Sequence, residues 1–267
     1  TRTNYYTFTV TPSTTVAEQV DLVYANVKGL SKGTSYSTGT YGSVGVPLNF
    51  RHTGSKIVVK VKNTADNLQF DVTGWKVGYL DNSGTFTYDN SLVTTGAGTL
   101  PVGLWTDNAS PSISNEYVYN LGDDAIEGIK KATGTKSLAG EMILVPQTTT
   151  AATKYSATDN TGTFNGSYIA LEVVIKNTDA SNTVVQEKTW ALFPVAFSWQ
   201  PGYKYTYIVD LAGGGYFEKN NGNTEVSPKA DDDLDPILED AEIKFVSVTV
   251  DDWSAADDIN VSGPTNN

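Results

Sequence analysis

The chain has 267 residues, with 18 Lys and Arg against 30 Asp and Glu, one His and no Cys. The lack of Cys excludes disulfides, thiolate nucleophiles and Cys-based zinc or iron–sulfur sites, and a single His excludes a multi-His metal centre. Because only 18% of the residues are charged and Tyr, Thr, Gly and Asn are abundant, the composition favours an extracellular β protein over a cytosolic helical enzyme.

The net charge of −12 belongs mainly to the C-terminal end of the chain. Residues 231–267 hold eleven acids and one base, so their net charge is −10 and residues 1–230 carry only −2. No basic patch indicates binding to nucleic acid or to an anionic membrane. No apolar run approaches the roughly 20 residues of a membrane-spanning helix, so no transmembrane segment is expected.

Alternation of apolar and polar residues with a period of two predicts β-strands in the first half of the chain. Residues 56–62 present one apolar face and one face that is mostly Lys. Residues 68–72 alternate in the same way, but the pattern slips by one at Thr73-Gly74 and resumes at 75–79. A slip of one residue beside a Gly predicts a β-bulge.

The later strands are expected to be short and separated by turns. The turn at 81–84 is expected to close a hairpin with 85–88, and Pro followed by Gly at 200–202 predicts a type II turn. The other strands expected are 168–175, 190–199, 203–211 and 243–250. Such a series of short strands is typical of β-sandwiches.

One segment near the middle of the chain has the features of a helix. Residues 123–131 begin with acids and end with bases, and Gly128 interrupts them, so one or two helical turns are expected. This segment lies between two strand-rich halves. We therefore expect the inter-domain region at 120–138, with one domain over 1–138 and the other over 139–267.

Three groups of residues follow one another in a recognisable order. They are DLVYA at 21–25 with VPLNFRH at 46–52, then ILVPQ at 143–147, then FSWQPGYKYTY at 197–207 with IKFVSVTVDDW at 243–253. Together they resemble the fimbrillins of Bacteroides-type bacteria, which are the subunits of type V pili. The resemblance spans most of the chain.

The resemblance implies an all-β protein of two tandem, seven-stranded, transthyretin-like β-sandwich domains. The N-terminal sandwich (1–138) is either trimmed or incomplete, because only twenty residues precede Asp21, and the C-terminal one (139–267) carries the acidic loop and the tail. The implied function is that of a structural pilus subunit that mediates adhesion, with no enzymatic activity and no cofactor. Its partners would be other pilus subunits, of the same or another kind, and a ligand on a host or bacterial surface.

The resemblance also implies a route to the cell surface. Family members are exported through an outer-membrane lipoprotein precursor, and an Arg-specific protease then removes an N-terminal strand. The groove that is left accepts a strand from a neighbouring subunit, which satisfies an open sheet edge. Arg2 is a candidate remnant of such processing, although the favoured alternative is that the scarcity of Arg is a feature of composition alone.

Two segments are the candidates for strand exchange. The acceptor groove is expected beside Ile57, Val59 and Val61. The donor is expected in the tail, where only Ile259 and Val261 alternate as large apolar residues. The candidate donor residues are Ala255, Ala256, Asp257, Asp258, Ile259, Asn260 and Val261.

Other functions compete with this one. Asp231, Asp233 and Asp235 are weak candidates for Ca²⁺, but they lack the spacing of an EF-hand and a solvated loop is favoured, so no metal site is expected. His52 could act as a general base, yet no serine motif accompanies it and a hydrogen-bonded structural role is favoured. A pair of catalytic carboxylates, as in a glycosidase, is the third possibility.

Aromatic residues suggest a binding function from another class, a surface glycan-binding β-sandwich module. An exposed platform of Trp and Tyr could stack on sugar rings, but a position in the core is favoured for the Trp residues. The aromatic residues concerned are Trp75, Trp105, Trp190, Trp199, Trp253, Tyr203, Tyr205 and Tyr207.

Overall fold

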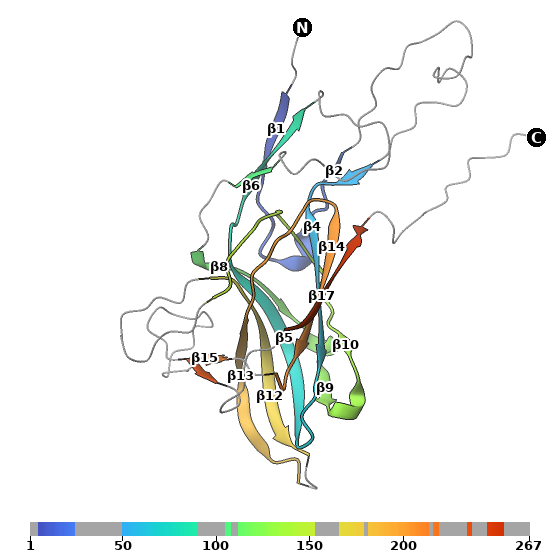
Figure 1. The fold of residues 1–267 in the computed structure, drawn as a ribbon, viewed down its shortest axis with the longest axis vertical. Coiled ribbons are helices and arrows are strands. Elements are labelled where there is room, and N and C mark those ends of the chain that lie inside the picture. Colours follow the sequence, from blue (N-terminus) through green and yellow to red (C-terminus); the bar gives the residue numbers. More distant parts are fainter. Residues whose placement is uncertain are drawn as a thin grey trace, which may run out of the picture.

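β-Strands dominate the described part of the chain in a computed structural model of the protein (Figure 1). The structure describes residues 5–24, 50–89, 105–107, 112–152, 166–178, 181–213, 216–218, 234–236 and 245–253. Over these residues the only helical segments are single 3₁₀ turns, at η1 (Val16–Glu18), η4 (Gly122–Asp124) and η5 (Lys131–Thr133). No helix there is long and apolar enough to cross a membrane. The expected all-β class is confirmed.

The larger of the two main sheets has seven strands, with β5 and β12 at its centre. Its order is β16-β15-β13-β12-β5-β8, and β9 pairs with the remaining part of β5, next to β8. All of these pairings are antiparallel. The strands are β5 (Leu68–Leu80), β8 (Ser112–Asn120), β9 (Ile126–Ile129), β12 (Tyr168–Asn177), β13 (Val184–Pro194), β15 (Tyr216–Glu218) and β16 (Leu234–Pro236).

The second main sheet has five strands in the order β10-β4-β14-β17, with β11 also paired to β4. β14 runs parallel to β4, whereas the other pairs are antiparallel. The strands are β4 (Ser55–Lys62), β10 (Lys136–Ser137), β11 (Met142–Leu144), β14 (Tyr203–Asp210) and β17 (Phe245–Asp252). Among the described strands, β17 therefore lies at the edge of its sheet.

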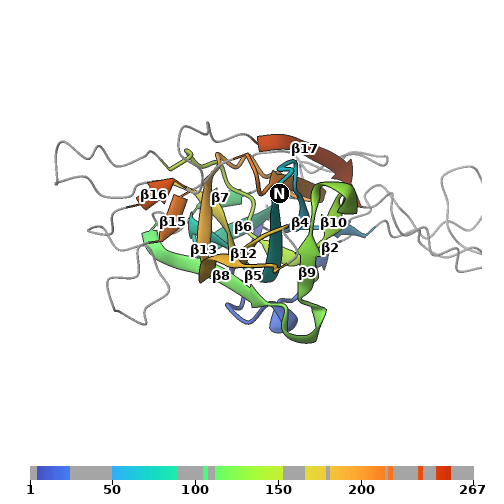
Figure 2. The same cartoon turned by 90° about the horizontal axis from the view of Figure 1, so that it is seen from below.

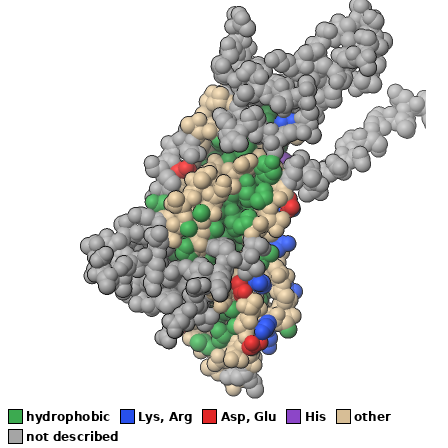
Figure 3. Space-filling view, in the orientation of Figure 1, with side chains coloured by type: hydrophobic (Ala, Val, Ile, Leu, Met, Phe, Trp, Pro, Cys, Tyr) green, Lys and Arg blue, Asp and Glu red, His purple; other side chains and the backbone are tan. Residues whose placement is uncertain are grey.

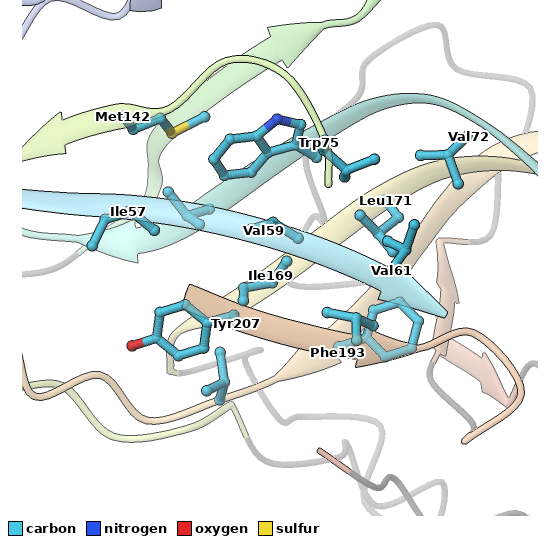
Figure 4. Packing of buried hydrophobic residues seen from close by; sticks show 14 of the residues in the cluster. Ile57, Val59, Val61, Val72, Trp75, Met142, Ile169, Leu171, Phe193 and Tyr207 are labelled. Atoms are coloured by element: carbon cyan, nitrogen blue, oxygen red, sulfur yellow. The ribbon is translucent and has the colours of Figure 1, made fainter. Parts of the chain in front are cut away.

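The two main sheets pack face to face and enclose one large hydrophobic core (Figures 2 and 4). Alternate residues of β4 and β14 point inward and meet those of β5, β12 and β13, as the period of two requires. Strands from both sides of residue 138 share these sheets, since β4 pairs with β14 and β5 pairs with β12. The described strands of the two expected halves thus contribute to the same core.

The predicted bulge in β5 is confirmed. Val173 pairs with Val72 and Glu172 with Gly74, so Thr73 is the extra residue on the longer strand. The extra residue shifts the alternation by one. For that reason the inward residues on both sides of the bulge, Val72 before it and Trp75 after it, are buried in the same core.

The prediction of a hairpin through the turn at 81–84 is wrong. β6 (Gly84–Asp89) pairs instead with β1 (Tyr5–Val10) and β7 (Trp105–Asp107) in a separate three-stranded sheet. The reason is that both edges of β5 are already occupied, by β12 on one side and by β8 and β9 on the other. The chain therefore leaves the sheet at Asp81, whose backbone N–H donates to Gln147 Oε1 at 2.9 Å.

The prediction of a helix at 123–131 is also wrong. Its central residues form β9, which takes the part of the β5 edge that β8 leaves open. Gly128 adopts φ +65°, outside the helical region, and its N–H donates to the buried carboxylate of Asp71 at 2.8 Å. Pairing with an open strand edge thus outweighs the charge pattern of a short, Gly-interrupted helix.

Candidate functional site

A cluster of side chains near one end of the sandwich joins residues from distant parts of the sequence. It lies where the short strands β2 (Val23–Tyr24) and β3 (Arg51–His52) form a two-stranded sheet. His52 Nδ1 is 2.6 Å from Asp21 Oδ2, and the imidazole stacks on the indole of Trp253 with ring centroids 3.8 Å apart. The favoured structural role of His52 agrees with these contacts.

Trp253 is the last described residue, and it is fixed in place by more than the stacking. The backbone N–H of Trp253 donates to Gly202 O at 3.0 Å, and the backbone N–H of Gly202 donates to Gly54 O at 2.8 Å. Gly202 has φ +78°, which agrees with the turn predicted at 200–202. The root of the C-terminal tail is thus attached to the turn that precedes β4.

β17 leads to Trp253 and forms the open edge of its sheet, as far as the described strands go. Val248 pairs with Tyr207 and Val250 with Tyr205, and directly paired residues point to the same face of a sheet. The two tyrosines are buried, whereas Val248 and Val250 remain 44% and 51% exposed. Hydrophobic side chains are visible in this part of the molecular surface (Figure 3). β17 therefore presents apolar side chains at an unpaired edge of the described sheet.

A groove lies between the main sandwich and the three-stranded sheet. Its cavity volume is about 500 Å³, and it runs between residues 8–13 and the outer edge of β11. Gln19 does not line the groove itself, but its side chain links two residues that do: its Oε1 accepts the Ile143 N–H at 2.7 Å and its Nε2 donates to Ser13 O at 3.0 Å. Sequence reasoning missed this groove, because no local pattern marks Gln19 as a bridge.

The residues predicted as the acceptor lie elsewhere. Ile57, Val59 and Val61 are fully buried in the core and do not line the groove. Among the described strands, β4 has β14 on one side and β10 and β11 on the other. A donor beside β4 would therefore have to take the place of β10 or β11.

Several predicted site residues lie outside the described residues. These are Arg2, the donor segment 255–261, Asp231 and Asp233; Asp235 belongs to β16, but its side chain is not described. Within the described ranges, no group of three or more His, Asp or Glu residues is arranged to hold a metal ion.

The Trp residues do not form an exposed platform in the described structure. Trp75, Trp190, Trp199 and Trp253 are buried, and Trp105 is half-buried. Trp199 Nε1 donates to the hydroxyl of Tyr207 at 2.8 Å inside the core, and burial raises the pKa of that hydroxyl. The favoured core position is confirmed for Trp75 and Trp199, which belong to the main hydrophobic cluster.

A buried ion pair on the other face of the seven-stranded sheet was not foreseen. Lys76 is fully buried, and its Nζ lies 3.1 Å from Glu116 Oε1 and 4.8 Å from the ring centre of Trp190. The hydroxyl of Tyr168 also donates to Glu116. The alternation placed Lys76 on the outward face of β5, but it could not show that neighbouring strands form a second buried apolar cluster on that face, which includes Tyr168 and Trp190.

Comparison with known proteins identifies the class of protein. Residues 1–253 match the model of the fimbrillin-like family, so the chain belongs to that family. No curated protein matches the chain.

Solved structures similar to this chain come from Bacteroides. A candidate cell adhesion protein from Bacteroides uniformis has 14% identity and a TM-score of 0.37, with 93% of this chain and 71% of that chain covered. A fimbrial protein from Bacteroides vulgatus has 15% identity and a TM-score of 0.40, with coverages of 80% and 57%. A candidate cell adhesion protein from Bacteroides ovatus has 18% identity and a TM-score of 0.37, with coverages of 92% and 60%.

Proposed function

We propose that this fimbrillin-like chain is a structural subunit of a cell-surface pilus that mediates adhesion and assembles by strand exchange. Family membership supports association with other pilus subunits. The proposed donor is the segment 255–261, which follows directly on β17 and Trp253.

The observation that carries the proposal is the arrangement of β17. An edge strand exposes unpaired backbone groups, which another chain can satisfy by adding a strand. β17 has one described neighbour, its inward-facing Val248 and Val250 are half exposed, and the chain continues from it into the donor segment. A contact between subunits at this edge would cover both valines and guide the tail into the next subunit.

A structural rather than an enzymatic role agrees with the contacts of the single His. The imidazole of His52 contacts Asp21 through Nδ1, and one of its faces lies against Trp253. Both contacts hold elements together at the root of the tail. His52 is therefore proposed as a structural residue of the subunit.

Denaturing electrophoresis of protein sheared from its native cell surface tests the proposal. Subunits joined by strand exchange should run as a ladder without heating and as one band after boiling, because each subunit must release a whole strand to dissociate. Deletion of the residues after Trp253 should abolish the ladder. A single monomer band without heating would contradict the proposed assembly and would favour a glycan-binding module.

A further inference from the structure

The groove between the main sandwich and the three-stranded sheet has the size of a small-molecule site. Its volume of about 500 Å³ lies within the range of roughly 300–1,000 Å³ that is typical of ligand pockets. Residues 8–13, alternate residues of 18–22, residues 53–54, Trp105 and residues 143–145 line it. Segments that are far apart in the sequence therefore form one site, which exists only in the folded protein.

Most of the side chains that line the groove are apolar. Phe8 and the half-buried Trp105 come from the three-stranded sheet, whereas Ile143 and Val145 come from β11 and the residue that follows it. Val20 also lines the groove and is 77% exposed, the largest exposed fraction of any large hydrophobic side chain described. The apolar part of a ligand would cover surface that the folded chain leaves in contact with water, which is favourable.

Glu18 is the one charged residue among the described residues that line the groove. It is exposed, and its Oε2 accepts a hydrogen bond from Ser13 Oγ at 3.3 Å. No Lys, Arg or His of the described part of the chain forms an ion pair with it. A carboxylate without a cation, beside apolar walls, complements a ligand that joins an apolar body to a cationic group. The net charge of −12 adds to the attraction of such a ligand.

We propose that this groove binds amphiphilic amines, which are molecules with an alkyl or aryl body and one ammonium group. The apolar body lies along Val20, between Phe8 and β11, and the ammonium group lies next to Glu18. A neutral amphiphile would gain the apolar contacts alone, and an anionic one would be repelled by Glu18. This binding activity goes beyond the proposed function, because a subunit outside a pilus would have it too.

NMR spectroscopy of the full chain, before assembly, tests the site with the indole N–H of Trp105 as the reporter. The chain has five Trp residues, and Trp105 is the one that lines the groove. Its signal is identified as the one that Trp105→Phe removes. Addition of octylamine should shift this signal and leave those of the other Trp residues in place. The Kd should increase about fourfold for each CH₂ group that is removed from the alkyl chain, because the groove covers that chain.

Ligands with the same alkyl chain but different head groups test the role of Glu18. Octylamine should bind about two- to fivefold more tightly than 1-octanol, because an exposed ion pair makes a small favourable contribution. Octanoate should bind more weakly than either. In Glu18→Gln, which keeps the size of the side chain, octylamine and 1-octanol should bind equally well. Equal affinities for these two ligands in the wild type would overturn the amine as the preferred ligand.

Two valine variants test the place of the alkyl chain. Val20→Ser removes apolar surface from the wall and should weaken the binding of octylamine by up to about tenfold. The matched control is Val185→Ser, because Val185 is also an exposed valine, at 56%, but belongs to β13 and does not line the groove. Its affinity for octylamine should equal that of the wild type. Equal losses of affinity in the two variants would overturn the groove as the binding site.

The outcomes also separate this inference from pilus assembly. A heat-sensitive ladder on electrophoresis, without any shift of the Trp105 signal, would overturn the amine site and leave the proposed function intact. Equal shifts of all the indole signals would show general attraction to an acidic protein and would also overturn the site. A Trp105 signal that moves with protein concentration, without added amine, would show that a second copy occupies the groove and would overturn the small ligand as occupant.

Discussion

The imidazole of His52 lies parallel to the indole of Trp253, with 9° between the planes and 3.8 Å between the ring centroids. The two residues are far apart in sequence, and Asp21 approaches the same imidazole at 2.6 Å. Stacked aromatic pairs contribute about 0.5–1.5 kcal/mol beyond the burial of their surface. These contacts therefore connect the N-terminal segment to the residue that directly follows β17.

Trp253→Ala should lower the free energy of unfolding by about 3 kcal/mol, because it removes a large buried side chain and the stacking partner of His52. Trp253→Phe keeps an aromatic ring and should cost less than half as much. Urea unfolding of both variants measures the difference. Equal losses in the two variants would mean that stacking on His52 contributes nothing.

The buried pair of Lys76 and Glu116 should be strongly coupled. Lys76→Met alone leaves a nearly buried carboxylate without its cation and should cost about 3–5 kcal/mol. Adding Glu116→Gln removes the negative charge that Lys76 had balanced, so the double variant should be more stable than the sum of the single effects indicates. Urea unfolding of the three variants gives the coupling energy.

A matched comparison is the exposed pair of Lys131 and Asp66, with a distance of 2.9 Å between Nζ and Oδ1. Lys131→Met should change the free energy of unfolding by less than about 1 kcal/mol, because exposed ion pairs contribute little. If Lys76→Met and Lys131→Met lowered the free energy of unfolding by similar amounts, burial would not make the Lys76–Glu116 pair more costly to break than an exposed pair.

The strands that follow a clear alternation could be predicted from sequence. β4 and the bulge at Thr73 depend on which residues face inward, and this information is local. The hairpin to β6 could not be judged in the same way, because it depends on whether the edge of β5 is free. That edge is taken by β8, β9 and β12, and no local signal reports such competition.

The candidate site was predicted less well than the strands, for a related reason. The structural role of His52 was foreseen from the lack of catalytic companions, but its partner Trp253 was not. The bridge from Gln19 to Ile143 spans 124 positions in the sequence. A side-chain amide becomes a bridge only through the spacing of two backbones, and that spacing is set by the packing of the whole sandwich.

Alkaline pH should destabilise the fold through its buried tyrosines. Burial raises the pKa of Tyr117 to about 12, while an unfolded tyrosine titrates near 10. The folded state thus keeps a proton that the unfolded state loses, so the stabilisation is complete below about pH 10 and is lost as the pH rises toward 12. Burial also raises the pKa of Tyr205 and Tyr207, which adds to the effect.

Urea unfolding at about pH 9 and about pH 11 tests this dependence. The wild type should lose up to about 1.4 kcal/mol per pH unit for each such tyrosine above pH 10. Tyr117→Phe has no hydroxyl to titrate, so it should lose less stability over the same interval. Parallel curves for the wild type and Tyr117→Phe would show that Tyr117 ionises as easily in the folded state as in the unfolded one.

Gly140 should be one of the least replaceable residues of the connection between β10 and β11. It adopts φ +87°, and a Cβ there would lie 2.2 Å from the ring of Tyr119. The preceding carbonyl, of Ala139, accepts the Trp75 Nε1–H at 2.7 Å, so the connection cannot shift without losing a hydrogen bond to the core. Gly140→Ala should therefore combine backbone strain with a steric clash, at a total cost of about 2–5 kcal/mol.

Gly134→Ala separates these two effects, because Gly134 also has a positive φ, of +73°, but no atom of the described residues lies within 4 Å of the place that an added methyl group would take. It should cost about 1–3 kcal/mol, the strain of a backbone conformation (φ +73°, ψ −167°) that only Gly adopts readily. The difference between the two variants in urea unfolding then measures the clash with Tyr119. Equal costs would mean that the Tyr119 ring moves aside freely, and the connection would then be held by the backbone conformation of Gly140 and the bond from Trp75 alone.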